Sequence, residues 1–223
     1  MAQRKAPRRT RERILETSLA LFNRDGEPHV TTADIADEMN ISPGNLYYHF
    51  RNKDEIVGHL YTSFEGKLKP LFDTAPPRAA GVEDLWLVLH LLFEQMWEYR
   101  FLFRDLDEIV SRSRRVGARF AELIRRGETT VVELCRGLAH AGTLNATERE
   151  IAALAKNAVL VSMYWMSFER IGERRADGPS DVAAGMPRLD RAAYQVLSLI
   201  APYLVGDDRA LIEHLGREYL QED

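Results

Sequence analysis

Apolar residues recur every three to four positions along most of this chain, which is the spacing of one buried face of an α-helix. Turn signals such as Pro76-Pro77 and Gly142-Thr143 separate the periodic stretches. From Lys53 onward the predicted helices are 53–72, 82–98, 100–110, 113–140, 147–172, 188–204 and 207–221. No stretch alternates apolar and polar residues for long enough to predict a strand. The pattern therefore predicts an all-α protein.

Two short helices are predicted side by side between residues 31 and 50. Thr31 can cap the first of them, and Asp34 follows three residues later, near the capping-box position. Ser42 can cap the second, with a proline in its first turn. Asn40 lies between the two helices and suits a tight left-handed turn.

This arrangement is that of a helix-turn-helix, in which the second helix enters the major groove of DNA. Ile41 and Leu46 are expected to point inward and to hold the second helix against the first. An amphipathic helix over residues 10–25 precedes the pair and completes a three-helix unit. An ordinary helical hairpin is the alternative that the pattern leaves open.

The charge distribution narrows the picture. The 223 residues carry a formal net charge of −4, so the chain as a whole is not a basic nucleic-acid binder. Residues 1–13, however, have a local charge of +5. Their bases are Arg4, Lys5, Arg8, Arg9, Arg11 and Arg13. A basic arm at a terminus commonly contacts nucleic acid, and a solvated, disordered tail is the alternative.

Composition also excludes several classes of protein. The single cysteine, Cys135, lies in an amphipathic pattern that favours the core, and one cysteine builds neither a disulfide framework nor a cysteine zinc site. This usage predicts a cytoplasmic protein. No apolar run approaches the roughly 18 residues of a membrane helix. No metal-ligand spacing, catalytic triad or phosphate loop is present, so we expect no metal, no cofactor, no catalytic residues and no enzyme.

The segment from Thr10 to Tyr61 resembles the DNA-binding domain of the TetR family of bacterial transcriptional regulators. The resemblance rests on an amphipathic first helix followed in fixed order by Thr31-Thr32 and Ile35-Ala36. Its most specific part is the block Leu46-Tyr47-Tyr48-His49-Phe50, which Lys53 follows three residues later.

This resemblance implies a division of the chain into two domains. Residues 1–53 would form the helix-turn-helix DNA-binding domain with its basic arm. Residues 54–223 would form a larger helical bundle for dimerisation and ligand binding. The chain departs from the family pattern at Asn40, where glycine is usual, and asparagine also tolerates that backbone conformation.

Nine residues are predicted to contact DNA. Hydroxyl groups at helix N-termini suit phosphates, Asn45 suits the edge of an adenine, and Gly44 lets the helix backbone approach the groove. The tyrosine, histidine and lysine side chains would contact phosphates, and the acids of the first short helix would lie away from the DNA. The set is Thr31, Thr32, Ser42, Gly44, Asn45, Tyr47, Tyr48, His49 and Lys53.

Aromatic residues recur at helical spacing in the later helices, where the resembled family has a ligand pocket. The rings predict a small apolar or amphipathic effector. The candidate lining residues are Trp86, His90, Phe93, Trp97, Tyr164 and Phe168. Ordinary core packing is the alternative for each of them.

The resemblance further implies a homodimer through the last long helices. The apolar stripes at 151–166 and 192–204, with Ala158 and Val159 among them, are the predicted interface, and burial within one subunit is the alternative. We therefore expect a repressor that binds a palindromic DNA operator as a dimer and is released by the effector. A regulator of the same fold without a small effector, controlled by a partner protein or by abundance, is the alternative function.

Overall fold

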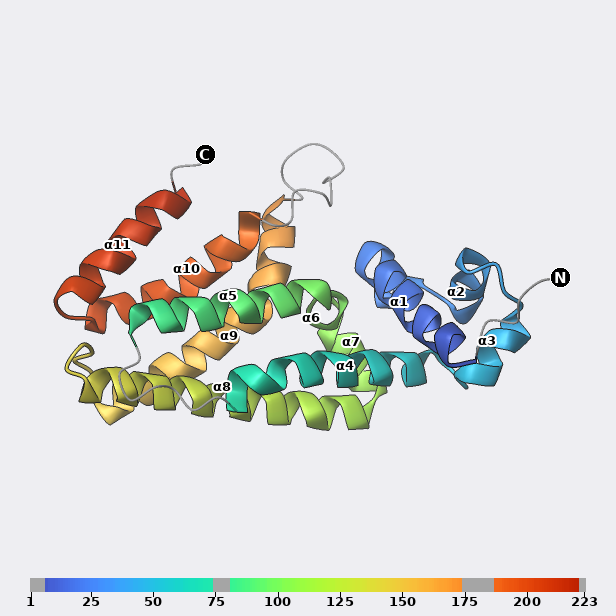
Figure 1. Ribbon diagram of the computed structural model, residues 1–223, viewed down its shortest axis with the longest axis horizontal. Helices are drawn as coiled ribbons and strands as arrows, with labels where there is room; N and C mark the ends of the chain where they lie inside the picture. The colour runs from blue at the N-terminus through green and yellow to red at the C-terminus, as the bar shows by residue number, and fades with distance from the viewer. Residues whose placement is uncertain (1–6, 74–80, 174–186, 221–223) are drawn as a thin grey trace. The chain divides into compact units, whose positions relative to one another are not determined.

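The computed structural model describes residues 7–73, 81–173 and 187–220 (Figure 1). The chain divides into two compact units. The first unit comprises residues 1–66 and 99–118, and the second unit comprises residues 67–98 and 119–223.

The first unit combines the N-terminal helices with a corner from the middle of the chain. Its elements are α1 (Pro7–Asp25), the 3-10 helix η1 (Glu27–His29), α2 (Thr32–Glu38), α3 (Pro43–His49), the first part of α4 (Lys53–Asp73), α6 (Phe101–Arg104), α7 (Leu106–Arg112) and the start of α8 (Arg114–His140). Helix α2 packs against both α1 and α3. The ring of Phe22 in α1 lies 5.2 Å from that of Phe101 in α6, centroid to centroid. Helix α6 therefore shares a core with the N-terminal helices.

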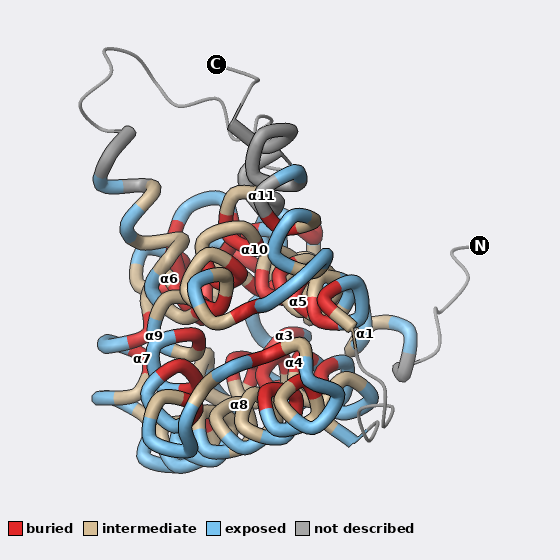
Figure 2. Tube along the Cα trace, turned by 90° about the vertical axis from the view of Figure 1, so that its left-hand side faces the viewer, coloured by how far each residue is buried: buried red, intermediate tan, exposed pale blue. Residues whose placement is uncertain are grey.

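The second unit is a bundle of mostly longer helices. It holds α5 (Val82–Glu98), α9 (Glu148–Glu173), α10 (Pro187–Ile200), the 3-10 helix η3 (Ala201–Tyr203), α11 (Asp207–Leu220) and the remaining parts of α4 and α8. Helix α10 packs against α5, α9 and α11 (Figure 1). Buried positions gather along α5 and α10 (Figure 2), among them Leu89 and Phe93 on α5 and Ala193 and Leu197 on α10. These two helices therefore supply much of the core of this unit.

Cys135 is part of the same core. Its side chain is buried in α8, and this burial raises the pKa of the thiol to about 11. A thiol with such a pKa carries very little thiolate at neutral pH, which is the reactive form. The structure thus supports the packing role expected of this residue.

The predicted all-α fold is confirmed, and the largest differences from the predicted helices are at 100–110 and 188–204. The helix predicted over 100–110 is divided into α6 and α7 by a break at Asp105, where the backbone leaves the helical conformation with a φ of −110° and a ψ of 24°. The Asp105 carboxylate accepts a hydrogen bond from the backbone N–H of Glu27 at 2.9 Å. The helix predicted over 188–204 ends at Ile200, and the chain continues as η3, which contains Pro202. Proline lacks the N–H that a continuing α-helix needs.

The packing also places the boundary between the units differently from the sequence. Sequence reasoning divides the chain after Lys53, whereas the first unit extends to Gly66 and takes in residues 99–118. The ring of Phe64 on α4 lies 5.5 Å from the rings of both Tyr99 and Phe103. This part of α4 therefore lies in the core of the first unit.

Helix α9 is more apolar than we expected. The stretch Glu148–Glu169 has a mean hydropathy of 1.3, which meets the length and composition of a membrane span, so the expectation that no such run exists is wrong. A single helix of this kind is weak evidence for a membrane protein, because the core helix of a soluble protein can have the same length and composition. One side of α9 is buried in the second unit, at Ile151, Leu154, Ala155, Ala158 and Ser162.

The two positions predicted at a subunit interface, Ala158 and Val159, differ in burial. Ala158 is 2% exposed. A Cβ atom added to Gly127 of α8 would lie 3.3 Å from Val159 Cγ2, so α8 and α9 cross closely at this point. The alternative, burial within one subunit, therefore applies to Ala158, whereas Val159 is half-buried beside α8.

Candidate nucleic-acid interface

The start of α2 is fixed by a capping box. The backbone N–H and the hydroxyl of Thr31 donate to Asp34 Oδ2 at 2.7 and 2.8 Å, and the Thr31 hydroxyl accepts from the Asp34 N–H at 3.2 Å. The hydrogen bond from the Thr31 backbone, together with that from its hydroxyl, lowers the pKa of the Asp34 carboxyl. The hydroxyl of Thr31 is thus already used within the protein, and its contact with a phosphate stays a prediction.

A tight turn leads from α2 into α3. Asn40 has a φ of 52°, in the left-handed region that asparagine tolerates. The N–H of Ile41 donates to the carbonyl of Ala36 at 3.0 Å, which closes the turn. Ser42 then caps α3, with its hydroxyl accepting from the N–H of Asn45 at 3.2 Å. The caps and the turn fall where the sequence predicts them.

Helix α3 has one buried and one exposed side. Leu46 is fully buried with Ile35 and Ala36 of α2, while Gly44, Asn45, Tyr47 and Tyr48 are exposed. Tyr48 is 78% exposed, and Tyr47 beside it is 51% exposed. The exposed side therefore offers an amide, two phenols and an open backbone position to a ligand.

The hydroxyl groups of Thr32 and Tyr47 link the two short helices. Their oxygen atoms lie 3.0 Å apart, so one donates to the other. His49 is half-buried, with its ring packed edge-on against the ring of Tyr48 at 5.1 Å. These contacts hold the exposed phenols in defined orientations.

Lys53 points to the interior rather than to the exposed side of α3. Its ammonium donates to the carbonyls of Glu27 at 2.8 Å and Val30 at 3.0 Å. It also lies 3.2 Å from the carboxylate of Glu27, which is 0% exposed. Sequence reasoning could not find these acceptors, because they lie 23 and 26 residues earlier in the chain.

Arg11 also has a place that the charge pattern did not suggest. Its guanidinium lies over the ring of Phe50, 4.7 Å from the centroid, and Nη2 is 2.7 Å from His59 Nε2. A guanidinium can only donate, so His59 is neutral there with its proton on Nδ1. Burial, followed by the charge of Arg11, lowers the pKa of His59. Arg4 and Lys5 lie outside the described residues.

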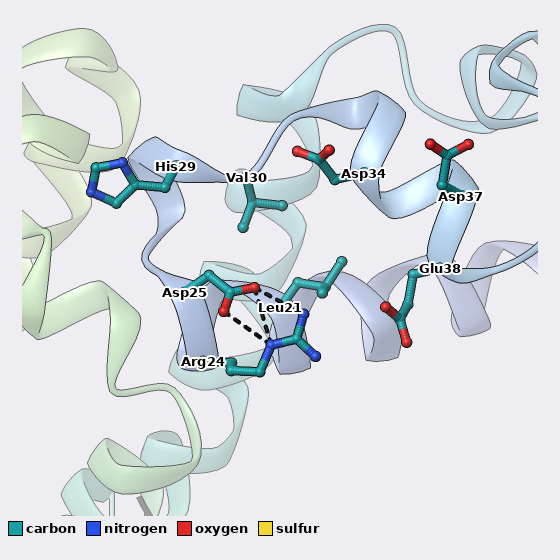
Figure 3. A pocket seen from close by; sticks show the side chains of 8 residues that line it. All are labelled: Leu21, Arg24, Asp25, His29, Val30, Asp34, Asp37 and Glu38. Atoms are coloured by element: carbon teal, nitrogen blue, oxygen red, sulfur yellow. Dashed lines mark hydrogen bonds and ion pairs between the residues drawn. The ribbon is translucent and has the colours of Figure 1, made fainter. Parts of the chain in front are cut away.

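An acidic hollow lies between α1 and α2 (Figure 3). Asp34, Asp37 and Glu38 project from α2, and Arg24 forms an ion pair with Asp25 at the end of α1. The remaining lining residues are Leu21, His29 and Val30. Its carboxylates repel phosphate, so this hollow is unfavourable for a nucleic-acid backbone. Within the described ranges, no His, Cys, Asp and Glu side chains gather in a group that could hold a metal ion.

Two family models match the chain. The model described as "Bacterial regulatory proteins, tetR family" matches residues 14–60, and the model described as "Bacterial transcriptional repressor" matches residues 63–212. The chain belongs to the TetR family of bacterial transcriptional regulators. Members of this family bind DNA and are regulators rather than enzymes, so the helix-turn-helix is a DNA-binding element.

Individual TetR-family relatives agree with this assignment. A TetR-family regulator from Marinobacter aquaeolei is 34% identical, with a TM-score of 0.82 over 94% of this chain and 98% of its own. The transcriptional repressor KstR2 of Mycolicibacterium smegmatis is 32% identical over 44% of this chain, and the regulator IcaR of Staphylococcus epidermidis is 37% identical over 21%. The matched segments span half of KstR2 and a quarter of IcaR.

The candidate effector residues of this TetR-family chain fall into two sets. On α5, Phe93 is fully buried and the ring of Trp86 stacks on that of His90 at 5.1 Å, while Trp97 is half-buried. On α9, Tyr164 and Phe168 are exposed, at 49% and 69%. The α5 set is placed as core or pocket residues would be, whereas the α9 set lies on the surface of this subunit.

Proposed function

We propose that this protein is a repressor that binds a palindromic operator as a homodimer and is released by a small effector. The observation that carries the proposal is the exposed side of α3, with Asn45, Tyr47 and Tyr48 presented by a capped, two-turn helix. An exposed carboxamide on a recognition helix suits adenine N6 and N7 in the major groove. The names of relatives such as KstR2, a transcriptional repressor, support repression rather than activation.

A dimer is supported by an exposed apolar stripe on α9. Leu160, Tyr164, Phe168 and Ile171 are between 49% and 69% exposed and follow at intervals of four, four and three residues, on one side of the helix. Such a stripe is costly in water and is typical of a contact surface. We propose that the α9 helix of a second copy covers it.

Two subunits are also needed for specificity. One recognition helix of two turns reads only a few base pairs, and a two-fold dimer doubles that number and requires two inverted half-sites. The spacing of these half-sites is then set by the distance between the two recognition helices.

The effector is proposed to be apolar or amphipathic and to bind near the α5 residues Trp86, His90, Phe93 and Trp97. Their rings offer apolar contact area, and the His90 imidazole adds a polar group. Ligand and DNA must then bind the two conformations of the dimer with different affinities, and the coupling is reciprocal. We also propose a cytoplasmic location, where the operator DNA is.

The function is tested by selecting binding sites from random DNA and mapping genomic binding by footprinting. We expect an inverted repeat with a fixed spacing and a dimer in sedimentation at micromolar concentration. Release of the bound DNA is then followed with fatty acids, sterols and other amphipathic compounds. A monomer that selects single, unpaired sites would contradict the proposal, and a dimer released by none of these compounds would favour the regulator without an effector.

A further inference from the structure

A fully buried carboxylate lies next to the DNA-reading helices. Glu27 is in η1, between α1 and α2, and its Oε1 is 3.2 Å from Lys53 Nζ and 2.6 Å from Arg112 Nη2. Its Oε2 is also buried and has no hydrogen-bond partner among the described residues. Both cations therefore contact the same carboxylate oxygen. Without them, burying the negative charge of Glu27 would cost a large amount of free energy.

The two cations connect three separate segments of the first unit. Lys53, the first residue of α4, binds the carbonyls of Glu27 and Val30 and so holds the segment that leads into α2. Arg112, the last residue of α7, also donates from Nε to Asp54 Oδ1 at 2.6 Å. We call the group of Glu27, Lys53, Asp54 and Arg112 the Glu27 junction; it holds two positive and two negative charges.

A second set of hydrogen bonds ties the same corner to the end of α1. The Arg104 guanidinium donates to the carbonyls of Phe22 and Asn23, and the N–H of Phe101 donates to Asn23 Oδ1 at 3.1 Å. Asp105 accepts from the N–H of Glu27 at 2.9 Å. The α6–α7 corner is thus bonded to the chain just before α2 on both sides of Gly26.

We propose that the Glu27 junction sets the direction of the α2–α3 pair relative to α4 and the α6–α7 corner, and that Arg112 is its positioning residue. The inference rests on the proposed binding of paired half-sites. Helices α4 and α8 both continue from the first unit into the second, and Arg112 lies at the joint between α7 and α8. The junction therefore ties the first residue of α4 and the end of α7, which lead along the chain into the second unit, to the segment that precedes the recognition helix.

The α2–α3 pair has its own apolar contacts, so the junction is not needed to fold it. Ile35, Ala36, Leu46 and Phe50 are all fully buried. Buried ion pairs are often no more stabilising than apolar side chains of similar volume, so geometry is the property that these charges supply. Without Arg112, the α2–α3 pair keeps its base contacts, but its orientation relative to α4 is less defined. The distance between the two recognition helices of a dimer then varies more.

The test compares Arg112→Met with the control Arg136→Met. Methionine keeps much of the aliphatic stem and removes both ion pairs of Arg112. Arg136 makes an exposed ion pair with Glu148 in the second unit. Each full-length protein is given a DNA library in which two copies of the half-site selected by the wild type are separated by spacers of different lengths.

We expect R112M to keep the half-site sequence preference and the dimer of the wild type. Its preference for the best spacer over the next best should fall by roughly 2- to 30-fold, the range for residues that modulate coupling without touching a ligand. R136M should match the wild type, and Arg112→Lys should recover part of the preference because it keeps the charge. A loss of stability alone would weaken binding to all spacers equally.

Two outcomes separate this inference from the proposed function. A wild type without any spacer preference overturns paired half-site binding and the junction with it. A sharp wild-type preference that is unchanged in R112M overturns the junction alone. If R112M does not fold, the double variant E27Q/R112M, which removes the buried carboxylate charge as well, is measured in its place, and an unchanged spacer preference in that protein equally overturns the junction.

Discussion

Thr32 and Tyr47 share a hydrogen bond across the two helices of the helix-turn-helix, with their hydroxyl oxygens 3.0 Å apart. The two residues are 15 positions apart and lie on different helices, so the periodicity of one helix does not predict their contact. The bond fixes the orientation of the Tyr47 phenol on the exposed side of α3, which is the surface that we propose contacts DNA.

The first prediction concerns this pair. Tyr47→Phe and Thr32→Val should each weaken operator binding, and the double variant should lose less than the sum of the two. We expect a coupling energy of about 0.5–1.5 kcal/mol, typical of one hydrogen bond. A double-mutant cycle on the dissociation constants measures it. Strict additivity would show that the bond does not persist on DNA.

The second prediction concerns base recognition by Asn45. Asn45→Ala should cost roughly 1–3 kcal/mol at one operator position and little at the others. The cap of α3 should survive, because Asn45 contributes its backbone N–H, not its side chain, to Ser42. Operator variants measured at constant salt check the discrimination, and thermal unfolding checks the fold. If N45A discriminates among the operator variants as the wild type does, Asn45 does not read a base.

The third prediction concerns Lys53. Lys53→Ala should lower the free energy of unfolding by roughly 1–3 kcal/mol, because the buried Glu27 carboxylate and two carbonyls lose a donor while Arg112 remains. Lys69→Ala is the control, since Lys69 is 70% exposed and lies 4.0 Å from Asp73; it should change stability by no more than about 0.5 kcal/mol. Denaturant unfolding measures both.

The same variant tests the phosphate contact expected of Lys53 from the sequence. Operator affinity should fall steeply as salt rises, because many phosphate contacts release counterions. If Lys53 contacts a phosphate, the variant should reduce the salt slope by about one unit. A slope equal to that of the wild type, with lower stability, would assign Lys53 to the interior alone.

The fourth prediction concerns the subunit contact. Leu160→Glu should give folded monomers that lose specific DNA binding, because Leu160 lies in the exposed stripe of α9. Leu87→Glu on α5 is the matched control: the two leucines are 55% and 49% exposed. Ala158→Asp should instead unfold the protein, since Ala158 is buried. Sedimentation and circular dichroism separate these outcomes, and a dimeric L160E protein would place the contact elsewhere.

The fifth prediction concerns pH. Because the pKa of His59 is lowered in the folded protein, the unfolded chain binds a proton at this residue at a higher pH than the folded protein does. The contribution of neutral His59 to the free energy of unfolding is therefore complete above the pKa of the unfolded chain, near 6.5. This contribution is lost as the pH falls from there toward the lower pKa of the folded state. His59→Gln should remove this part of the pH dependence of unfolding. Identical curves for the wild type and the variant would contradict the prediction.

Local sequence signals account for the helix-turn-helix, and contacts between distant residues account for what they missed. Asn40 and Ser42 determine the turn and the cap through backbone preferences, so both could be predicted. Glu27 could not, because a glutamate between two helices is ordinarily exposed, and its partner Arg112 is 85 residues away. Ala158 and Leu160 belong to one apolar stretch, and only the packing of α9 shows which of them is exposed.

The two-part construction of the first unit has a consequence for how such regulators can recombine. An exchange of the N-terminal segment alone would join residues 1–66 to the remainder of another regulator, without Arg104 and Arg112. The buried Glu27 would then contact side chains of that other protein in place of its own cations. Chimeras would therefore work best when residues 99–118 travel with the N-terminal segment. The DNA-binding unit of this chain is compact, but it is built from two separate segments of the sequence, so a single crossover cannot transfer it whole.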